Sequence, residues 1–282
     1  MKTISKIRIT LKDIQSNSIG GLLVGLEIWS KAVIPFLWNN SECWFEMPKK
    51  ALDLINTITH SFFRTLFCSA KGTPVSMYYW DTKSLLNHNF LILRKLLFFH
   101  HLISLPEDSL AKNILNLKEE KGHPSEYRTL LEELQIDEDP ANFSKEHWKK
   151  HVSKKVHLKN KREILSKFNS SKKLDKEKLS SEEYDMKKYL STMKMSEGRT
   201  FFSSRSMMIS TVQCNFKSKP EYKANDYKCK CGDHLDTQTN LLTCRLYEHL
   251  REGLDLANSD TDLVRYFQLV IKERHQEQEN NK

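Results

Sequence analysis

The stretch KKALDLINTITHSFFRTLF (residues 49–67) decides the fold class, because its apolar side chains recur at the spacing of a helix. Side chains three and four residues apart lie on one face of a helix. The residues that share this face are Leu52, Ile55, Thr59, Phe62, Phe63 and Leu66. We therefore expect a helix over residues 49–67 that packs its aromatic and aliphatic stripe into a core.

The composition extends this prediction to the rest of the chain. Only 8 glycines and 7 prolines occur among 282 residues, so few residues interrupt helices. The hydrophobic fraction of 39% is enough for a core, while the charged fraction of 29% requires a large solvated surface. We predict a mainly α protein of one or two domains.

Two further helix starts stand out. Pro106-Glu107-Asp108 suits the first turn of a helix whose core stripe would be Leu110, Ile114 and Leu117. Ser259-Asp260-Thr261-Asp262 begins another, because an acidic residue three positions after a serine suits the exposed amides of a first turn. In that second helix Leu263, Phe267, Val270 and Ile271 share a face. From Glu273 onward we expect a frayed polar tail.

The chain divides by composition into a helical region (1–120), a basic, charged segment (121–195) and a C-terminal region (196–282). Between Lys145 and Lys178 there are thirteen Lys and Arg against four Asp and Glu. The resulting net charge of +9 equals that of the whole chain.

Concentrated basic residues favour binding to nucleic-acid phosphates. Trp148 lies among them and is expected to stack on unpaired bases, as is Phe168. The candidate nucleic-acid-binding residues are Trp148, Lys149, Lys150, Lys154, Lys155, Lys159, Lys161 and Arg162. The alternative is a solvated helix face or a linker, and the run from Asn169 to Lys173 is loop-like.

A cysteine-rich turn near the C-terminus predicts a small metal knuckle. Cys229, Cys231 and Cys244 lie within sixteen residues. Zinc prefers four thiolate or imidazole ligands in a tetrahedron, so a fourth donor is needed, either His234 or His249. We assign Cys229, Cys231, His234 and Cys244 as the candidate ligands. The alternative is a knuckle that packs without metal. Cys43, Cys68 and Cys214 are expected to be buried apolar residues.

The knuckle resembles the Cys/His knuckle near the C-terminus of reverse transcriptases from non-long-terminal-repeat retrotransposons, especially jockey-like elements. Those enzymes carry Cys-x-x-Cys, an Asp/Glu-Thr-Gln turn, His-x-x-x-Cys and Tyr-x-x-Leu-Arg. Here the first pair is Cys-x-Cys, and Asn240 occupies the histidine position. Upstream, residues 20–29, 33–35, 39–44, 62–67, 72–74 and 79–81 are similar, in the same order, to the segment that follows the palm in these enzymes.

The resemblance implies a thumb-like helical region over residues 1–120 and a C-terminal region that binds RNA or DNA. Reverse transcriptases hold two magnesium ions on palm aspartates, including an Asp-Asp pair. The chain has no Asp-Asp dipeptide and begins near the start of the thumb. We therefore expect no magnesium site, no catalytic residues and no polymerase activity by this chain alone, with the remainder of a polyprotein as a partner. The alternative is a helical protein-interaction module or an inactive retrotransposon remnant.

The sequence also bears on location. Charged residues break up the first thirteen positions before an apolar signal segment could form. Residues 91–105 are apolar but contain Arg94, Lys95, His100 and His101, which makes them too short and too charged to span a bilayer. We expect a soluble intracellular protein without a membrane partner.

Overall fold

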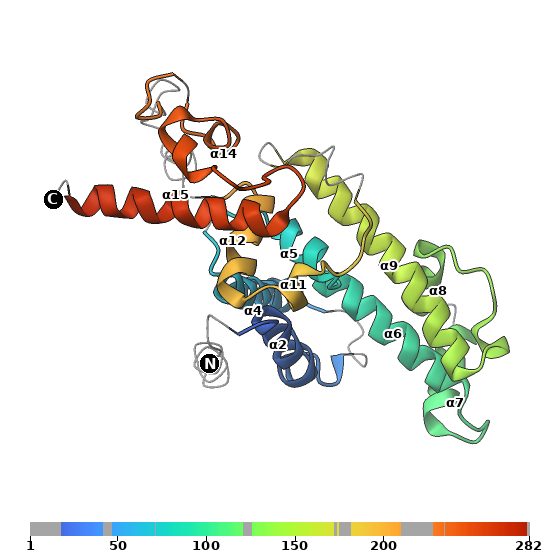
Figure 1. Cartoon of the computed structure of the whole chain (residues 1–282). Coiled ribbons are helices and arrows are strands. Elements are labelled where there is room, and N and C mark those ends of the chain that lie inside the picture. Colours follow the sequence, from blue (N-terminus) through green and yellow to red (C-terminus); the bar gives the residue numbers. More distant parts are fainter. Residues whose placement is uncertain are drawn as a thin grey trace.

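A computed structural model describes residues 18–41, 47–70, 72–120, 126–171, 174, 182–209, 228–233 and 235–280. It is mainly helical, as the sequence predicts (Figure 1). In the described ranges β-pairing consists of two isolated bridges, Ile19 with Lys194 and Lys228 with Leu235. The helices of the first half are α2 (Gly21–Ile28), π-helical η1 (Trp29–Val33), α3 (Ile34–Leu37), α4 (Lys49–Phe67), α5 (Val75–Thr82), α6 (Asn87–Ile103) and α7 (Leu110–Glu120). Those of the second half are α8 (Glu126–Glu133), 3-10 helix η3 (Pro140–Asn142), α9 (Lys145–Ser170), α11 (Tyr189–Thr192), α12 (Met195–Arg205), α14 (Gln238–Leu241), 3-10 helix η5 (Arg245–Leu250) and α15 (Asp260–Asn280).

Helix α4 has the predicted bounds and buries the predicted stripe except for Leu52, which is half-buried. Phe63 stacks on Tyr78 of α5 with ring centroids 5.4 Å apart, and Phe67 meets Phe202 of α12 at 4.2 Å. The largest core cluster gathers side chains from α2, α4, α5, α9 and α12. Residues from all three segments of the sequence therefore share one core.

Helix α9 joins this core to a second one. Its buried residues recur every four positions, at 148, 152, 156, 160, 164 and 168. A helix turns 100° per residue, so this spacing moves the buried face by about 40° at each step. The first three residues pack against α6 and α8, and Ile164 and Phe168 pack into the core of α4 and α5. Helix α9, the described part of the chain in which the basic residues are concentrated, is thus a structural helix lying alongside α6 (Figure 1).

Buried Asn160 marks the junction between these two cores. Its side-chain oxygen accepts a hydrogen bond from the backbone N–H of Leu86 at 2.9 Å. Its amide nitrogen donates to the hydroxyl of Tyr184 at 2.6 Å and to the carbonyl of Ser84 at 3.2 Å. These bonds satisfy the polar group where α9 changes neighbours.

The prediction for α7 was wrong in two respects. The helix begins at Leu110, after a turn, and the stripe expected in the core is exposed: Leu110 is 74% exposed, Ile114 47% and Leu117 53%. Leu115 points inward instead and is 8% exposed. With the buried position shifted by one residue, α7 presents an apolar face outward.

Helix α6 contains most of the apolar segment 91–105, which is too charged to span a membrane. Its Lys95 is buried and forms an ion pair with Glu126. Among the described residues, no helix combines the length and the apolar character that a membrane crossing needs.

Cys68, expected in the core, is exposed where α4 ends in a left-handed turn with φ 49°. Cys43 and Cys214 lie outside the described residues.

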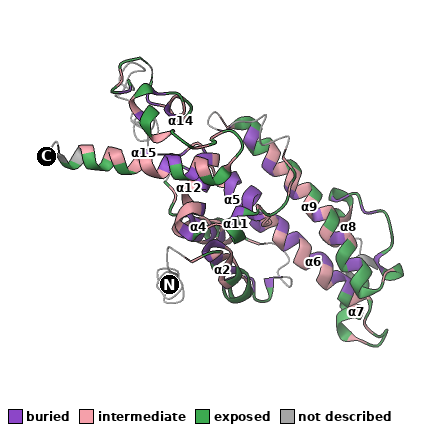
Figure 2. Ribbon diagram, in the orientation of Figure 1, coloured by how far each residue is buried: buried purple, intermediate pink, exposed green. Residues whose placement is uncertain are grey.

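The C-terminal region forms a separate small core around α15, at the opposite end of the molecule from α7 (Figure 1). Ser259 caps α15 as predicted, since its hydroxyl accepts a hydrogen bond from the N–H of Asp262 at 3.2 Å. The predicted frayed tail was wrong, because the helix continues to Asn280. Figure 2 shows buried residues in the first half of α15, where it crosses α12, and exposed or half-buried ones beyond.

Candidate metal centre

Three thiols converge in the C-terminal core. The sulfur atoms of Cys229, Cys231 and Cys244 all lie within 4.8 Å of one another, and the Cys229 and Cys244 sulfurs are 3.7 Å apart. Cys229 and Cys244 are buried, at 6% and 1% exposure, and Cys231 is half-buried. The cluster can hold a metal ion, because thiolates are strong ligands for zinc and other soft ions.

A short hairpin brings the first two thiols together. The bridge between Lys228 and Leu235 closes it, and the N–H of Gly232 donates to the carbonyl of Cys229 at 2.9 Å. Gly232 has φ +83°, a conformation that side chains other than glycine rarely adopt. The Cys-x-Cys-Gly sequence is therefore suited to a tight turn with both sulfurs on one side.

The third thiol follows helix α14. Thr237 caps this helix by accepting a hydrogen bond from the N–H of Asn240 at 3.1 Å. Arginine side chains then hold the carbonyls of two cysteines: Arg245 donates to Cys231 at 2.9 Å and Arg251 donates to Cys244 at 2.8 Å. These contacts fix the backbone on both sides of the cluster.

The fourth ligand is not supplied at the position where the resembling enzymes carry histidine. The amide of Asn240 donates to the carbonyl of Leu235 at 3.0 Å, so it holds the hairpin to α14. His249, one of two alternative donors, instead contacts Glu273 at 3.1 Å. His234, the other, lies outside the described residues.

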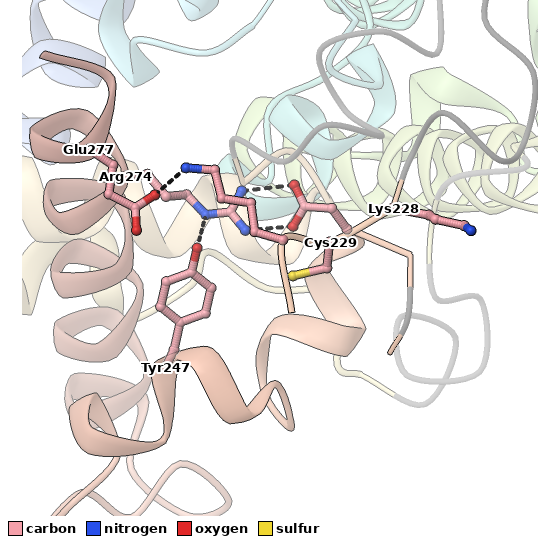
Figure 3. Close-up of a pocket in the computed structure, with 7 residues that line it drawn as sticks. Lys228, Cys229, Tyr247, Arg274 and Glu277 are labelled. Atoms are coloured by element: carbon pink, nitrogen blue, oxygen red, sulfur yellow. Dashed lines mark hydrogen bonds and ion pairs between the residues drawn. The ribbon is translucent and has the colours of Figure 1, made fainter. Parts of the chain in front are cut away.

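An ion pair fastens the knuckle to α15 (Figure 3). Asp236, 3% exposed, receives two hydrogen bonds from Arg274, at 2.5 and 2.9 Å. Arg274 also donates to the hydroxyl of Tyr247 at 3.0 Å, and Lys230 pairs with Glu277 at 2.6 Å. Sequence reasoning missed Arg274 because its partner is 38 residues away. The sequence marks Asp236 only as part of the Asp236-Thr237-Gln238 turn, and that turn does not indicate a distant arginine.

The Cys229 thiol favours its protonated form. Burial is the main cause, and together with the neighbouring thiols it raises the pKa of Cys229 to about 12. A bound cation would reverse this preference, because metal ligation requires thiolates and releases their protons. Metal binding at this site would therefore weaken as the pH falls.

The other predicted site residues lie on α9, at a distance from the thiols (Figure 1). Lys149, Lys150, Lys154 and Arg162 are exposed, and Lys161 is half-buried. Two other predicted cations, Lys155 and Lys159, make contacts within the protein. Lys155 donates to the carbonyl of Gln135 at 2.7 Å, and Lys159 pairs with Glu133 at 3.1 Å and with Glu163.

Trp148 was predicted to stack on bases, and this was wrong. Its indole is 0% exposed, stacks on His100 and donates to the carbonyl of Leu96 at 3.0 Å. Phe168, at 1% exposure, is also part of the core. Both aromatics belong to the buried stripe of α9, which the surrounding lysines obscure in the sequence.

No family model, curated protein or solved structure matches the chain in comparisons of sequence and fold.

Proposed function

We propose that this chain binds RNA or DNA through α9 and carries a zinc-binding knuckle at its C-terminal end. It would act as the non-catalytic C-terminal part of a retrotransposon reverse transcriptase. The observation that carries the proposal is a row of cations on α9, opposite its buried start. We define the α9 cationic stripe as Lys150, Lys154 and Lys161.

The stripe follows from helix geometry. At 100° per residue its three side chains fall within about 40° of one another, on the side of α9 opposite Trp148 and Val152. They extend over about 16 Å at 1.5 Å per residue. His157 lies on the same side of the helix. Burial, and to a lesser extent the charge of Lys83, lowers the pKa of His157, so this side chain adds little charge at neutral pH.

Rigid spacing suits a phosphate backbone. A helix held along its length by two cores presents its lysines in a fixed row, and each phosphate that it neutralises releases counterions. The aromatic side chains of α9 are buried, so the proposed contact is with backbone phosphates and not with stacked bases.

Zinc is the proposed ion at the knuckle, with Cys229, Cys231 and Cys244 as ligands and His234 as the fourth. Its role would be structural, because the thiols lie among the apolar residues that dock α15. The resembling enzymes carry their Cys/His knuckle in the same part of the chain. This resemblance is the reason for preferring zinc over other soft ions.

A salt titration tests nucleic-acid binding. The wild-type chain and Lys150→Gln/Lys154→Gln/Lys161→Gln are titrated with a labelled DNA duplex and a single-stranded RNA between about 50 and 200 mM salt. For the duplex we expect the log–log slope of the variant to be shallower by roughly 2 to 3, since each lost phosphate contact removes about 0.9.

The matched control removes three exposed lysines elsewhere, as Lys49→Gln/Lys50→Gln/Lys188→Gln. It carries the same net charge as the stripe variant and should keep the wild-type slope. Equal slopes for the two variants would show that only overall charge matters and would contradict the role of α9.

A protein-interaction module is the alternative function. The exposed Leu110, Ile114 and Leu117 of α7 favour it, because they form an apolar row at helical spacing. Nucleic-acid binding that is weak and indifferent to the stripe variant would favour this alternative.

A further inference from the structure

The three thiols differ in their access to solvent. Cys229 and Cys244 are buried against Tyr247, Tyr266 and Phe267 of the C-terminal core. Cys231 is half-buried at the tip of the hairpin, beside the left-handed turn at Gly232. A small oxidant from solvent therefore meets Cys231 first, while the Cys229 and Cys244 sulfurs, 3.7 Å apart, are buried in the core.

We propose that this cluster is a peroxide-oxidised modification site, in which Cys231 reacts first and a Cys229–Cys244 disulfide is the final product. The inference goes beyond nucleic-acid binding. It rests on the positions of the thiols and holds whether or not zinc is the bound ion.

The chemistry proceeds in three balanced steps. The thiolate of Cys231 attacks a peroxide oxygen, the O–O bond breaks, and a sulfenic acid and hydroxide form. Cys229 gives up its proton as its sulfur attacks the Cys231 sulfur, and the expelled hydroxide takes up that proton as water, giving a Cys229–Cys231 disulfide. The thiolate of Cys244 then attacks the Cys229 sulfur and releases Cys231 as a thiolate. In total, two thiols and one hydrogen peroxide give one disulfide and two waters.

The structure favours the Cys229–Cys244 disulfide over the Cys229–Cys231 disulfide. The Cys229 and Cys244 sulfurs have only to approach from 3.7 Å to about 2.05 Å, which small side-chain rotations can supply. A bond between residues fifteen apart also constrains the unfolded chain more than one between residues two apart. Finally, the apolar core covers the final disulfide and limits attack by other thiols.

Oxidation and metal binding exclude each other at this site. The disulfide consumes two of the three thiolate ligands, so a bound ion would be released. The hairpin and α14 would stay joined through the disulfide, and Asp236 and Arg274 would still hold the hairpin to α15. The knuckle would thereby exchange one crosslink for another under oxidising conditions.

The experiment uses the full chain, freed of metal with a chelator, reduced, and separated from reductant. It is treated with hydrogen peroxide, alkylated at successive times and mapped by mass spectrometry of its peptides. We expect a transient Cys229–Cys231 disulfide followed by a stable Cys229–Cys244 disulfide, with Cys231 alkylated at the end. Stable sulfinic acids, or a final disulfide that contains Cys231, would overturn the proposal.

Two variants separate the steps. Cys231→Ser should give the same Cys229–Cys244 product at least about tenfold more slowly, because the accessible thiol is gone. Cys244→Ser should stop at the Cys229–Cys231 disulfide. An unchanged rate in Cys231→Ser would refute the entry role of Cys231, even if the final product is as expected.

Cys68→Ser is the matched control, because it removes an exposed thiol away from the cluster. Its disulfide pattern and rate should equal those of the wild-type chain. The readout needs neither metal nor nucleic acid, so a failure of the proposed function leaves this result interpretable.

Discussion

Arg274 ties the buried side of the knuckle to the last helix. It contacts buried Asp236 and Tyr247, and its guanidinium lies 5.3 Å from the Tyr247 ring. Burial opposes the charged form, but the bonds to Asp236 outweigh it and raise the pKa of Arg274 further. The arginine is thus held charged in a half-buried position, and Asp236 depends on it.

Removing Arg274 should destabilise the C-terminal region sharply. Arg274→Met leaves the Asp236 carboxylate buried without its cation, which typically costs about 3–5 kcal/mol. Chemical denaturation of the variant checks this value. The double variant Asp236→Asn/Arg274→Met should recover part of the loss, because neither charge then remains. If the single and double variants were equally unstable, the two residues would not act as a pair.

Acid should destabilise the protein in two successive pH windows. Burial, helped by the charges of Arg64 and Lys167, lowers the pKa of His60 from 6.5 to about 4. Because its folded pKa is the lower one, the unfolded chain takes up the proton first, and stability is lost as the pH falls from 6.5 to 4. Allowing for solvent screening, we expect a loss on the order of 2 kcal/mol. Denaturation of His60→Gln over this window should show a flatter pH dependence.

The second window belongs to carboxylates. Burial alone would raise the pKa of Glu182, but Arg205 and Lys187 outweigh it and lower the pKa from 4.5 to about 2. The stability that this pairing contributes is present above pH 4.5 and is lost as the pH falls toward 2. Glu163 behaves alike, with Lys159 and His88 as partners. Glu182→Gln should therefore remove part of this acid dependence, and an unchanged profile would exclude the pairing.

At the scale of elements, α9 shows most clearly what sequence patterns reveal and hide. The helix and its charge are evident from the sequence, and so is the stripe of α4, because apolar residues there stand at spacings of three and four. The buried row of α9 was missed because its apolar members are isolated among lysines, and a spacing of four alone winds around the helix. That row is visible in the sequence only when its regular interval is sought.

The burial of Trp148 leads to a prediction that separates stability from binding. Trp148→Leu removes ring contacts and the hydrogen bond to Leu96 from a closed core, which should cost about 3 kcal/mol. The folded variant should bind nucleic acid as the wild-type chain does. Thermal melts and titrations well below the melting temperature measure the two effects. Binding loss at full folding would restore the stacking role that was first assigned to this residue.

Helix α7 illustrates the opposite case. Its apolar residues predicted a core stripe, but the one that packs inward is Leu115, between two of those expected. Periodicity identifies an amphipathic face, and only the neighbouring helices decide whether that face is covered. The sequence contains no local signal for that choice.

At the scale of the whole molecule, the cores do not follow the divisions of the sequence. One core draws on residues from α2 to α12 and on Val264 of α15, and the C-terminal core is built around the thiols, α14 and α15. The three cysteines could be grouped from their spacing, since short intervals keep side chains close. The anchoring of the knuckle by Arg274 could not, because it depends on where α15 lies after folding.

The zinc content of the purified, reduced chain tests the central claim most directly, because the knuckle joins the proposed function to the fold of the C-terminal region. Cys229→Ser/Cys231→Ser is the control, and His234→Ala asks whether that residue is the fourth ligand. We predict about one zinc per wild-type chain, none in the double-cysteine control and weakened binding in His234→Ala. A wild-type chain that contains no zinc after purification with zinc present would contradict the account of the knuckle as a metal centre.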